Sequence, residues 1–146
     1  NFFALLGTTC PALAIVQGAG CVGAGGPNAL AAVTLPWTGS TFRSLATGLA
    51  PNSLAISVHG LSTIATALSA ILPQGVPGCT LLVSPDLLEV YLPLGSSVET
   101  RIAIPSTVAL AGQVVHEQVV PMVFDALGNL TALTSTNALS LVIGTF

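Results

Sequence analysis

The side chains that could perform catalysis are few in this sequence and are spread along its length. General acid–base and nucleophilic catalysis need titratable or nucleophilic groups held close together. Apart from two arginines, the titratable side chains are Asp86, Glu89, Glu99, Glu117, Asp125, His59, His116, Tyr91, Cys10, Cys21 and Cys79. No Gly-x-Ser-x-Gly nucleophile motif is present. This inventory predicts a protein that is not an enzyme and that has no catalytic residues.

Two pairs of residues resemble fragments of known sites. Asp86 and Glu89 are close enough in sequence to suggest a glycosidase carboxylate pair. An aspartate directly after a proline is typical of a turn, so we interpret Asp86 as a turn residue and Glu89 as a solvated strand residue. His116 and Glu117 begin a His-Glu-x-x-His zinc motif, but Val120 stands where the second histidine is needed. We therefore expect a hydrogen-bonded His116 beside an exposed Glu117.

The remaining motifs predict no cofactor and no metal. The glycine-rich stretch 18–26 lacks the preceding strand and the following helix of a dinucleotide site, so we interpret it as turns. Calcium needs several converging oxygen ligands, and the five carboxylates are dispersed along the chain. His59 is a lone histidine at the polar end of an expected strand, which is an ordinary position for this residue.

The elements that must position these residues belong to a chain with almost no charge. Only 5% of the residues are charged, against roughly 25% in an average soluble domain, and lysine is absent. The mean hydropathy is +0.91, but the longest uncharged stretches are interrupted by proline and glycine, so no membrane span is expected. The net charge of −3 with two arginines disfavours nucleic acid as a partner. An uncharged surface of this kind favours contact with copies of the same chain.

The start of the sequence and its cysteines favour export. Position 1 is Asn and not Met, which suggests a mature form whose signal peptide has been removed. Three cysteines among so few reactive groups fit an oxidising compartment. We expect a secreted protein, located outside the cell or on its surface.

Glycine and proline divide the chain into short runs that are typical of strands and turns. The chain has 15 glycines and 10 prolines. The runs expected to form strands are residues 12–17, 29–35, 41–47, 53–59, 79–84, 87–92, 98–104, 113–124 and 139–143. The apolar residues within 61–72 have helical spacing, but the segment is short and rich in serine and threonine, so the presence of a helical turn there is left open. Pro121 suggests an edge position, a bulge or two consecutive strands for its run.

Alternation within these runs predicts which side chains face the interior. In residues 53–59, the face expected to lie inward carries Leu54, Ile56 and Val58, and the solvent face carries Ser53, Ser57 and His59. In residues 98–104, the inward face carries Val98, Ile102 and Ile104, and the solvent face carries Glu99 and Arg101. Eight or nine short strands without long helices predict an all-β, antiparallel β-sandwich of jelly-roll or Greek-key type. The expected domain spans residues 18–146, after an apolar N-terminal arm of residues 1–17.

Three stretches together resemble β-rich domains of secreted and cell-surface proteins of planctomycete-like bacteria, a functionally uncharacterised family. They are Gly-Ala-Gly-Cys at 18–21, Pro-Gly-Cys-Thr-Leu-Leu-Val-Ser-Pro-Asp at 77–86, and Ser-Thr-Asn-Ala-Leu at 135–139 leading into Val-Ile-Gly at 142–144. The resemblance implies a β-rich extracellular domain with a disulfide between Cys21 and Cys79. Because the sequence around Cys10 also resembles the first motif, pairing of Cys10 with Cys79, or with Cys21, remains an alternative.

Two functions fit this description. The first is an extracellular structural subunit that self-assembles into a filament, sheath or surface layer through apolar β-strand contacts. The residues expected at that interface are Phe2, Phe3, Leu5, Leu6, Leu13, Ile15, Val16 and Trp37. The alternative is a cell-surface adhesion or carbohydrate-binding module, for which Trp37 with Phe42 nearby is the only candidate platform. A glycan is a further candidate partner, because Asn129 begins a glycosylation sequon.

Overall fold

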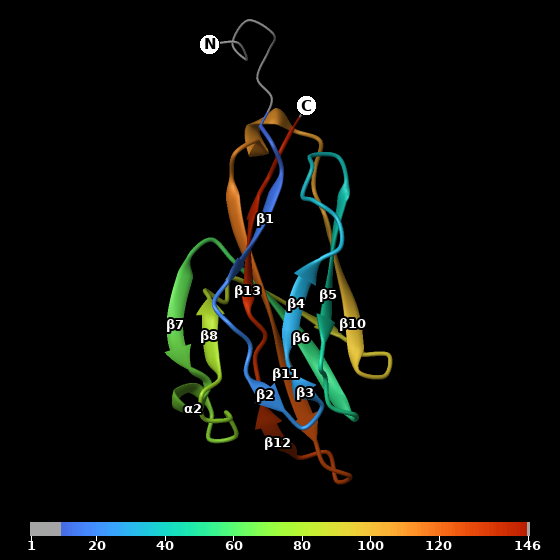
Figure 1. The fold of residues 1–146 in the computed structure, drawn as a ribbon, viewed down its shortest axis with the longest axis vertical. Coiled ribbons are helices and arrows are strands. Elements are labelled where there is room, and N and C mark those ends of the chain that lie inside the picture. The colour runs from blue at the N-terminus through green and yellow to red at the C-terminus, as the bar shows by residue number, and fades with distance from the viewer. Residues whose placement is uncertain (1–9, 146) are drawn as a thin grey trace, which may run out of the picture.

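Antiparallel strands make up most of the regular structure (Figure 1). The computed structural model describes residues 10–145. In chain order the strands are β1 (Leu13–Gln17), β2 (Val22–Gly23), β3 (Gly26–Pro27), β4 (Ala29–Ala32), β5 (Thr41–Thr47), β6 (Ser53–Gly60), β7 (Thr63–Ala67), β8 (Thr80–Val83), β9 (Leu87–Tyr91), β10 (Ser97–Ala103), β11 (Val114–Phe124), β12 (Leu130–Leu133) and β13 (Ala138–Val142). Two short helices, α2 (Leu68–Ile71) and the 3-10 turn η1 (Val108–Leu110), complete the elements. The all-β antiparallel prediction is confirmed, and the jelly-roll or Greek-key arrangement stays a prediction.

Each run expected to be a strand contains one, and four further strands are present. These are β2, β3, β7 and β12. The helical spacing of residues 61–72 produces only α2, because β7 occupies the first part of that segment and pairs with β8. β-Branched residues such as Thr63, Ile64 and Thr66 favour the extended backbone over the helix. Thirteen strands in the described residues therefore replace the eight or nine expected.

The central sheet has the order β1-β13-β11-β6-β9, with β12 pairing the far end of β11. All of its neighbouring strands are antiparallel. The long strand β11 passes through Pro121 without interruption or a register shift against β6, so the bulge and two-strand interpretations were wrong at that residue. On its other side Pro121 has a local edge position, because β13 pairs β11 only as far as Gln118 and β12 only from Met122. The Pro121 carbonyl accepts a hydrogen bond from Thr134 N at 3.1 Å, in the segment between β12 and β13. In an antiparallel strand the N–H and C=O of one residue face the same neighbouring strand. Proline has no N–H, and at Pro121 the neighbour on that side is the irregular segment between β12 and β13, so no ladder hydrogen bond is lost.

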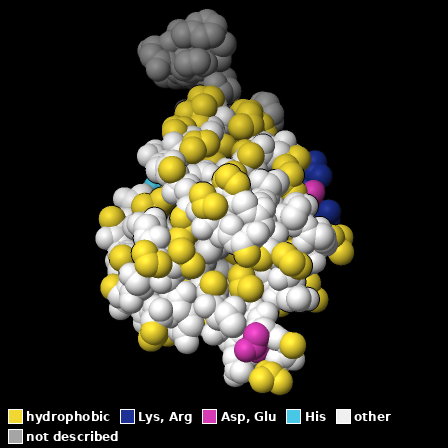
Figure 2. Space-filling model, turned by 60° about the horizontal axis from the view of Figure 1, so that its bottom comes forward, with side chains coloured by type: hydrophobic (Ala, Val, Ile, Leu, Met, Phe, Trp, Pro, Cys, Tyr) yellow, Lys and Arg dark blue, Asp and Glu magenta, His cyan; other side chains and the backbone are white. Residues whose placement is uncertain are grey.

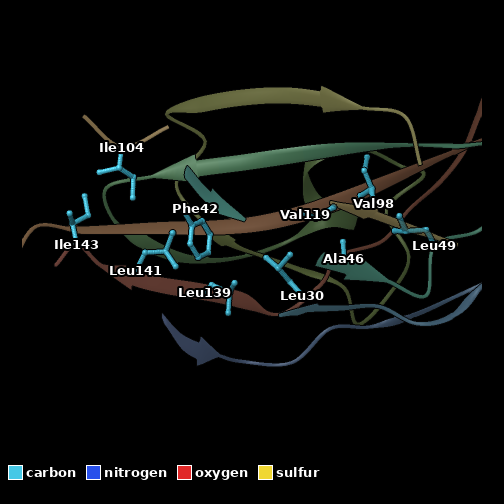
Figure 3. Close-up of a cluster of buried hydrophobic side chains, with 11 residues drawn as sticks. Leu30, Phe42, Ala46, Leu49, Val98, Ile104, Val119, Leu139, Leu141 and Ile143 are labelled. Carbon is cyan, nitrogen blue, oxygen red and sulfur yellow. The ribbon is translucent and has the colours of Figure 1, made fainter. Parts of the chain in front are cut away.

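A three-stranded sheet of order β10-β5-β4 covers one face of the central sheet (Figure 1). Apolar side chains from both sheets form the core between them, as Figure 3 shows. Its buried members are Leu30, Phe42, Ala46, Leu49, Ala55, Val98, Ile104, Val119, Leu139, Leu141 and Ile143. The inward face predicted for residues 98–104 is confirmed for Val98 and Ile104, which are 8% exposed.

A second core lies on the opposite face of the central sheet, beneath β7, β8 and α2. Val58, Val120 and Ala138 of the central sheet pack there with Leu81 and Val83 of β8. Val119 belongs to the first core and Val120 to the second, as expected of successive residues in a strand. The central sheet is therefore buried on both faces along part of its length, in a three-layer arrangement.

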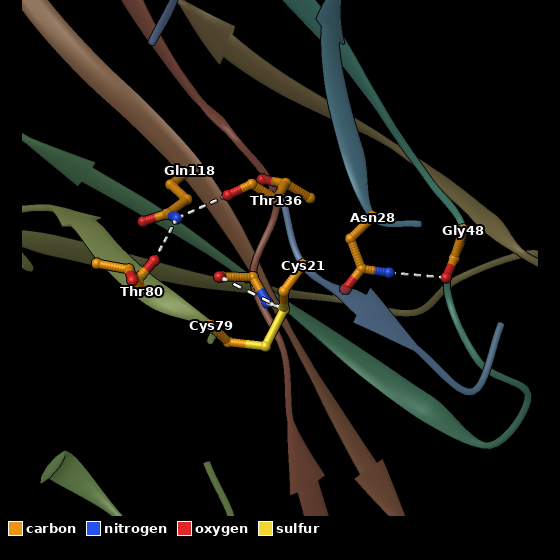
Figure 4. Close-up of a disulfide and its surroundings, with 8 residues drawn as sticks. Cys21, Asn28, Gly48, Cys79, Thr80, Gln118 and Thr136 are labelled. Carbon is orange, nitrogen blue, oxygen red and sulfur yellow. Dashed lines mark hydrogen bonds between the residues drawn. A yellow bond between two sulfur atoms is a disulfide. The ribbon is translucent and has the colours of Figure 1, made fainter. Parts of the chain in front are cut away.

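Two buried amide side chains attach the outer layers to the central sheet. Gln118 of β11 donates to the Thr80 carbonyl at 3.0 Å and to the Thr136 carbonyl at 2.8 Å (Figure 4). Its Oε1 accepts a hydrogen bond from Leu82 N at 2.8 Å. On the other side, Asn137 Oδ1 accepts from Leu30 N and its Nδ2 donates to Leu30 O, both at 2.9 Å. Each amide thus hydrogen-bonds to backbone groups on the unpaired side of an outer strand, which are those of β8 for Gln118 and those of β4 for Asn137.

The disulfide joins Cys21 to Cys79, as the family resemblance implied (Figure 4). Cys10 is a free, partly buried cysteine, so both alternative pairings were wrong. The bridge links residues separated by 58 positions, and a loop of that length contributes about 4 kcal/mol in the chain-entropy model. It fixes the segment before β2 to the layer formed by β7 and β8.

The described part of the expected N-terminal arm includes an edge strand of this sheet. β1 pairs with β13 along its whole length, from Leu13 with Val142 to Gln17 with Ala138. The interface residues Phe2, Phe3, Leu5 and Leu6 lie outside the described residues. None of the helices within residues 10–145 combines the length and hydropathy that crossing a membrane would require.

Candidate functional site

Five polar side chains from four strands meet in the interior between the two facing sheets; we name them the Glu117 cluster. Glu117 of β11 is 0% exposed. Its Oε1 accepts a hydrogen bond from Ser44 Oγ of β5 at 2.7 Å, and its Oε2 accepts from Thr100 Oγ1 of β10 at 2.7 Å. Ser57 Oγ of β6 donates to the same Oε2 at 3.1 Å, and His59 Nε2 lies 3.2 Å from it. Ser44 and Thr100 also hydrogen-bond to each other.

The placement of this cluster corrects three expectations. Glu117 was expected to be exposed, and Ser57 and His59 were expected on a solvent face, but all three are buried. The alternation itself was right, because Ile56 and Val58 do lie on the opposite face of β6. The error came from treating the polar face as the solvent face, whereas the sheet β10-β5-β4 covers it.

Glu117 is ionised in this interior because its donors outweigh its burial. Burial alone would raise the pKa of the Glu117 carboxyl. The hydrogen bonds from His59, Thr100 and Ser44 hold that pKa below its ordinary value. A buried carboxylate with this many donors is stable as an anion at neutral pH.

The Glu117 cluster lies at the junction between the sheets, and its member His59 also lines a surface pocket beside Gly60 and Leu61. Ser44, Ser57 and Thr100 are each 0% exposed, like Glu117 itself. His59 is 5% exposed, and its Nδ1 lies 3.6 Å from Glu89 Oε1 at the rim of the interior. Because two donors come from the sheet β10-β5-β4 and the acceptor comes from β11, the cluster acts as a polar link between the two layers.

The other carboxylates with shifted pKa values lie in turns. Asp86 Oδ2 accepts from Leu61 N at 2.9 Å and Ser84 Oγ at 2.8 Å, and these bonds hold its pKa below the ordinary value. Asp125 Oδ1 accepts from two backbone N–H groups of its own turn, those of Leu127 and Asn129, and its pKa is also lowered, chiefly by the Asn129 bond. Both residues therefore shape turns, as we interpreted Asp86.

His116 and Glu117 point to opposite faces of β11. His116 Nδ1 lies 2.9 Å from Ser140 Oγ on the face away from the cluster. Within residues 10–145, no three His, Cys, Asp or Glu side chains come close enough to hold a metal ion. The zinc motif that begins at His116 is thus not completed by residues from elsewhere in this part of the chain.

The two edge strands of the central sheet expose a row of large apolar side chains. On β9 and the residues after it these are Leu87, Leu88, Val90, Leu92 and Leu94, which are 56% to 87% exposed. On β1 they are Leu13, Ile15 and Val16, which are 44% to 61% exposed. In the described residues, the backbones of these two strands hydrogen-bond only within their ladders with β6 and β13. We call these strands the β9 edge and the β1 edge.

The two edges carry few of the features that usually prevent strands of different molecules from pairing. Such features are lysines, prolines, bulges and charged side chains on the edge strand. β1 has none of these, and the only charge within β9 is Glu89. The edges of the outer sheet are protected by side chains. Asn137 hydrogen-bonds to the Leu30 backbone of β4, and the Tyr91 hydroxyl hydrogen-bonds to the Arg101 backbone of β10.

The positive charges are confined to one place on the outer face of the sheet β10-β5-β4. Arg43 and Arg101 are opposite each other on neighbouring strands. Both contact the same carboxylate oxygen of Glu99, at 3.5 Å and 3.1 Å. Figure 2 shows these basic side chains beside an acidic one at the margin of a face that otherwise mixes apolar and uncharged groups. Most of the surface therefore offers no charge to repel another copy.

The aromatic platform that a sugar-binding module would need does not form. Phe42 is 0% exposed and belongs to the first core, so it cannot lie beside Trp37 on the surface. Trp37 is half-buried and bridges to Gly144 near the C-terminus. An open groove of about 460 Å³ next to Tyr91 is lined by Leu92 and Leu94, with Tyr91 as its one aromatic side chain.

Sequence reasoning placed residues 13–17 in an arm that docks on a neighbouring subunit, whereas they form an edge strand of the chain's own sheet, and it did not predict the β9 edge. Leu13, Ile15 and Val16 were expected at an interface, and the structure places them on an exposed strand. The run Leu-Leu-Glu-Val-Tyr-Leu at 87–92 is apolar on both faces, which is typical of a buried strand. A usable signal was the position of this run between Pro85 and Pro93, since prolines are common next to edge strands.

The comparisons with known proteins identify no relative of this chain. No family model, curated protein or solved structure matches it. The stretches that carry the family resemblance do meet in space, because Cys21 is bonded to Cys79 and Cys21 N donates to the Ser135 carbonyl at 2.9 Å. Membership of the planctomycete-like family stays a prediction.

Proposed function

We propose that this chain is an extracellular structural subunit that self-assembles through apolar β-strand contacts. The single observation that carries the proposal is the pair of exposed apolar edges, β1 and β9, on opposite sides of one sheet. An exposed, apolar edge strand presents unpaired N–H and C=O groups as a template for another strand. A protein with two such edges can bind a neighbour on each side, which is the minimum needed for a polymer.

Composition supports the same function. A soluble monomer normally repels its copies through surface charge, and the described surface carries one cluster of both arginines with Glu99 and a few scattered acids. The disulfide between Cys21 and Cys79 fits an oxidising compartment outside the cell. The Glu117 cluster, the buried amides and the disulfide make the subunit rigid, which suits a building block.

The energetics favour a reversible joint that depends on concentration. Covering the exposed parts of Leu and Val side chains contributes roughly 1 kcal/mol each, and each backbone hydrogen bond adds about 0.5–1.5 kcal/mol. One five-residue edge pairing therefore provides on the order of 10 kcal/mol before association costs of about 4–15 kcal/mol are subtracted. A single joint is weak, so the length of the polymer rises with the concentration of the protein.

Sedimentation velocity over a concentration series tests this function. We expect the full chain to shift from small to large species as its concentration rises, under native and non-reducing conditions. High salt should leave this shift largely unchanged, because the contacts are apolar and not ionic. A single monomeric species at every concentration would contradict the proposal and return attention to a monomeric binding module.

A further inference from the structure

We infer that the joint between subunits is formed by the β9 edge of one copy and the β1 edge of the next, paired in parallel. This inference rests on the proposed self-assembly and names the partner of each edge: a second copy of this chain. Four antiparallel steps separate β1 from β9, so the two strands run in the same direction. A copy displaced sideways without being turned over therefore brings its β1 alongside β9 in parallel.

The charge on β9 favours this joint over a symmetric joint between two β9 edges. Glu89 is the middle residue of β9. Two β9 strands paired antiparallel over their full length, about a two-fold axis at the middle of the strand, would place Glu89 opposite Glu89 of the second copy, and like charges in that position are destabilising. β1 is uncharged, so it fits against β9 without that repulsion. Glu89 keeps its position next to His59 in the joint.

The apolar side chains of the two edges also match on each face. The pairing register connects Leu13 through Val142 to Val114, and Leu88 through Val58 to Gln118. Val114 and Gln118 are an even number of residues apart on β11, so Leu13 and Leu88 face the same side of the sheet.

Several registers keep these faces matched, and we choose the one that sets the exposed side chains of the two edges side by side. Leu13 of one copy lies beside Leu88 of the other, and Ile15 beside Val90, on the face that carries β7 and β8. On the opposite face, Val16 lies beside Tyr91. Val16 and Val90 are 61% and 63% exposed, and this register covers both in one joint.

Such a joint is heterologous and therefore open-ended. Each copy uses a different surface on each side, so addition continues at both ends of a growing filament. Two symmetric joints, β9 with β9 and β1 with β1, would instead make each edge self-complementary. The two arrangements give opposite results when variants that block one edge are mixed.

The test blocks the edges one at a time with a lysine, which disfavours strand pairing at an edge. Val90→Lys blocks the β9 edge, and Ile15→Lys blocks the β1 edge. Both positions are exposed, at 63% and 45%, so we expect the subunit to fold, as circular dichroism and thermal unfolding would check. Leu127→Lys is the matched control, because Leu127 is 86% exposed in the turn between β11 and β12.

We expect Val90→Lys and Ile15→Lys to be monomers separately and to form a 1:1 heterodimer, but no polymer, when mixed. Leu127→Lys should polymerise like the unmodified chain. Homodimers of each single variant would overturn the parallel joint and support symmetric ones. Polymerisation of both single variants would also overturn it while leaving self-assembly in place. A monomeric unmodified chain would instead refute the proposed function itself.

Discussion

At the scale of single residues, the least expected feature is a carboxylate buried without a basic side chain other than a histidine. Glu117 has an ionised form stabilised by three hydroxyl groups and His59. The sequence contains these residues at ordinary strand positions, and their polarity suggested solvent exposure. Which face of a strand is covered depends on strands distant in sequence, and that information is absent from a local pattern of alternation.

Substitution of Glu117 by Gln should lower the free energy of unfolding at pH 7 by about 2–4 kcal/mol, since it replaces charge-assisted hydrogen bonds and leaves His59 without its anion. Urea denaturation measures this difference. Glu99→Gln is the control, because the Glu99 side chain is 31% exposed and surface ion pairs contribute about 1 kcal/mol or less. Equal losses in the two variants would contradict the role assigned to Glu117.

The same substitution should change how stability depends on pH. The pKa of Glu117 in the folded state lies below its ordinary value of 4.5. Its contribution is therefore complete above the ordinary value and is lost as pH falls through the lowered pKa. We expect the difference in free energy of unfolding between the unmodified chain and Glu117→Gln to disappear at acid pH. A gap that stays constant between pH 7 and acid pH would show that ionisation of Glu117 is not its source.

At the scale of elements, hydrophobic alternation located the strands but not their layers. Residues 41–47 and 113–124 were predicted nearly to their observed limits, because both runs are rich in β-branched and apolar residues and are bounded by turn residues. The layer of β7 and β8 was not predicted, since Gln118 and the disulfide hold it in place through contacts between distant segments. A buried glutamine in a strand gives no local sign that it replaces a missing strand partner.

Replacement of Gln118 by Leu should destabilise the attachment of β8 to β11. The change leaves the Leu82 N–H and the Thr80 carbonyl without their partner, at a cost of about 1–3 kcal/mol for each buried group. Hydrogen exchange should show faster exchange in β7 and β8 than in β6. Gln113→Leu is the control, because Gln113 is exposed. Unchanged exchange in β8 would contradict the role of the Gln118 amide.

The N-terminal segment should be tested by deletion of residues 1–9 and not of residues 1–17. Removing the longer segment would strip β1 from β13 and create a new edge, because β1 is part of the sheet. We expect the shorter deletion to leave a folded subunit with weaker self-assembly, since it removes Phe2, Phe3, Leu5 and Leu6. Light scattering at matched concentrations measures the loss. Assembly equal to that of the full chain would show that these nine residues are dispensable for it.

At the scale of the whole molecule, the proposed self-assembly depends on a central sheet whose two edge strands, β1 and β9, are open to strands of other copies. In the outer sheet, side chains from other segments hydrogen-bond to the backbone of the edge strands β4 and β10. The central sheet instead ends on both sides in exposed apolar strands. Low charge, which composition alone revealed, explains why such edges do not repel another copy. The identity of the second edge could not be predicted from the sequence, because it depends on which strand ends the sheet.

The most direct measurement is the axial rise per subunit in electron micrographs of the assembled protein. The continuous path through one copy contains five strands. Strands in a sheet are about 4.8 Å apart, so edge-to-edge addition in one direction predicts an axial rise of about 24 Å per subunit. Symmetric joints would double the repeat to about 48 Å. Filaments with a rise of about 24 Å would support the account, and a rise unrelated to the width of this sheet, or no assembly at all, would contradict it.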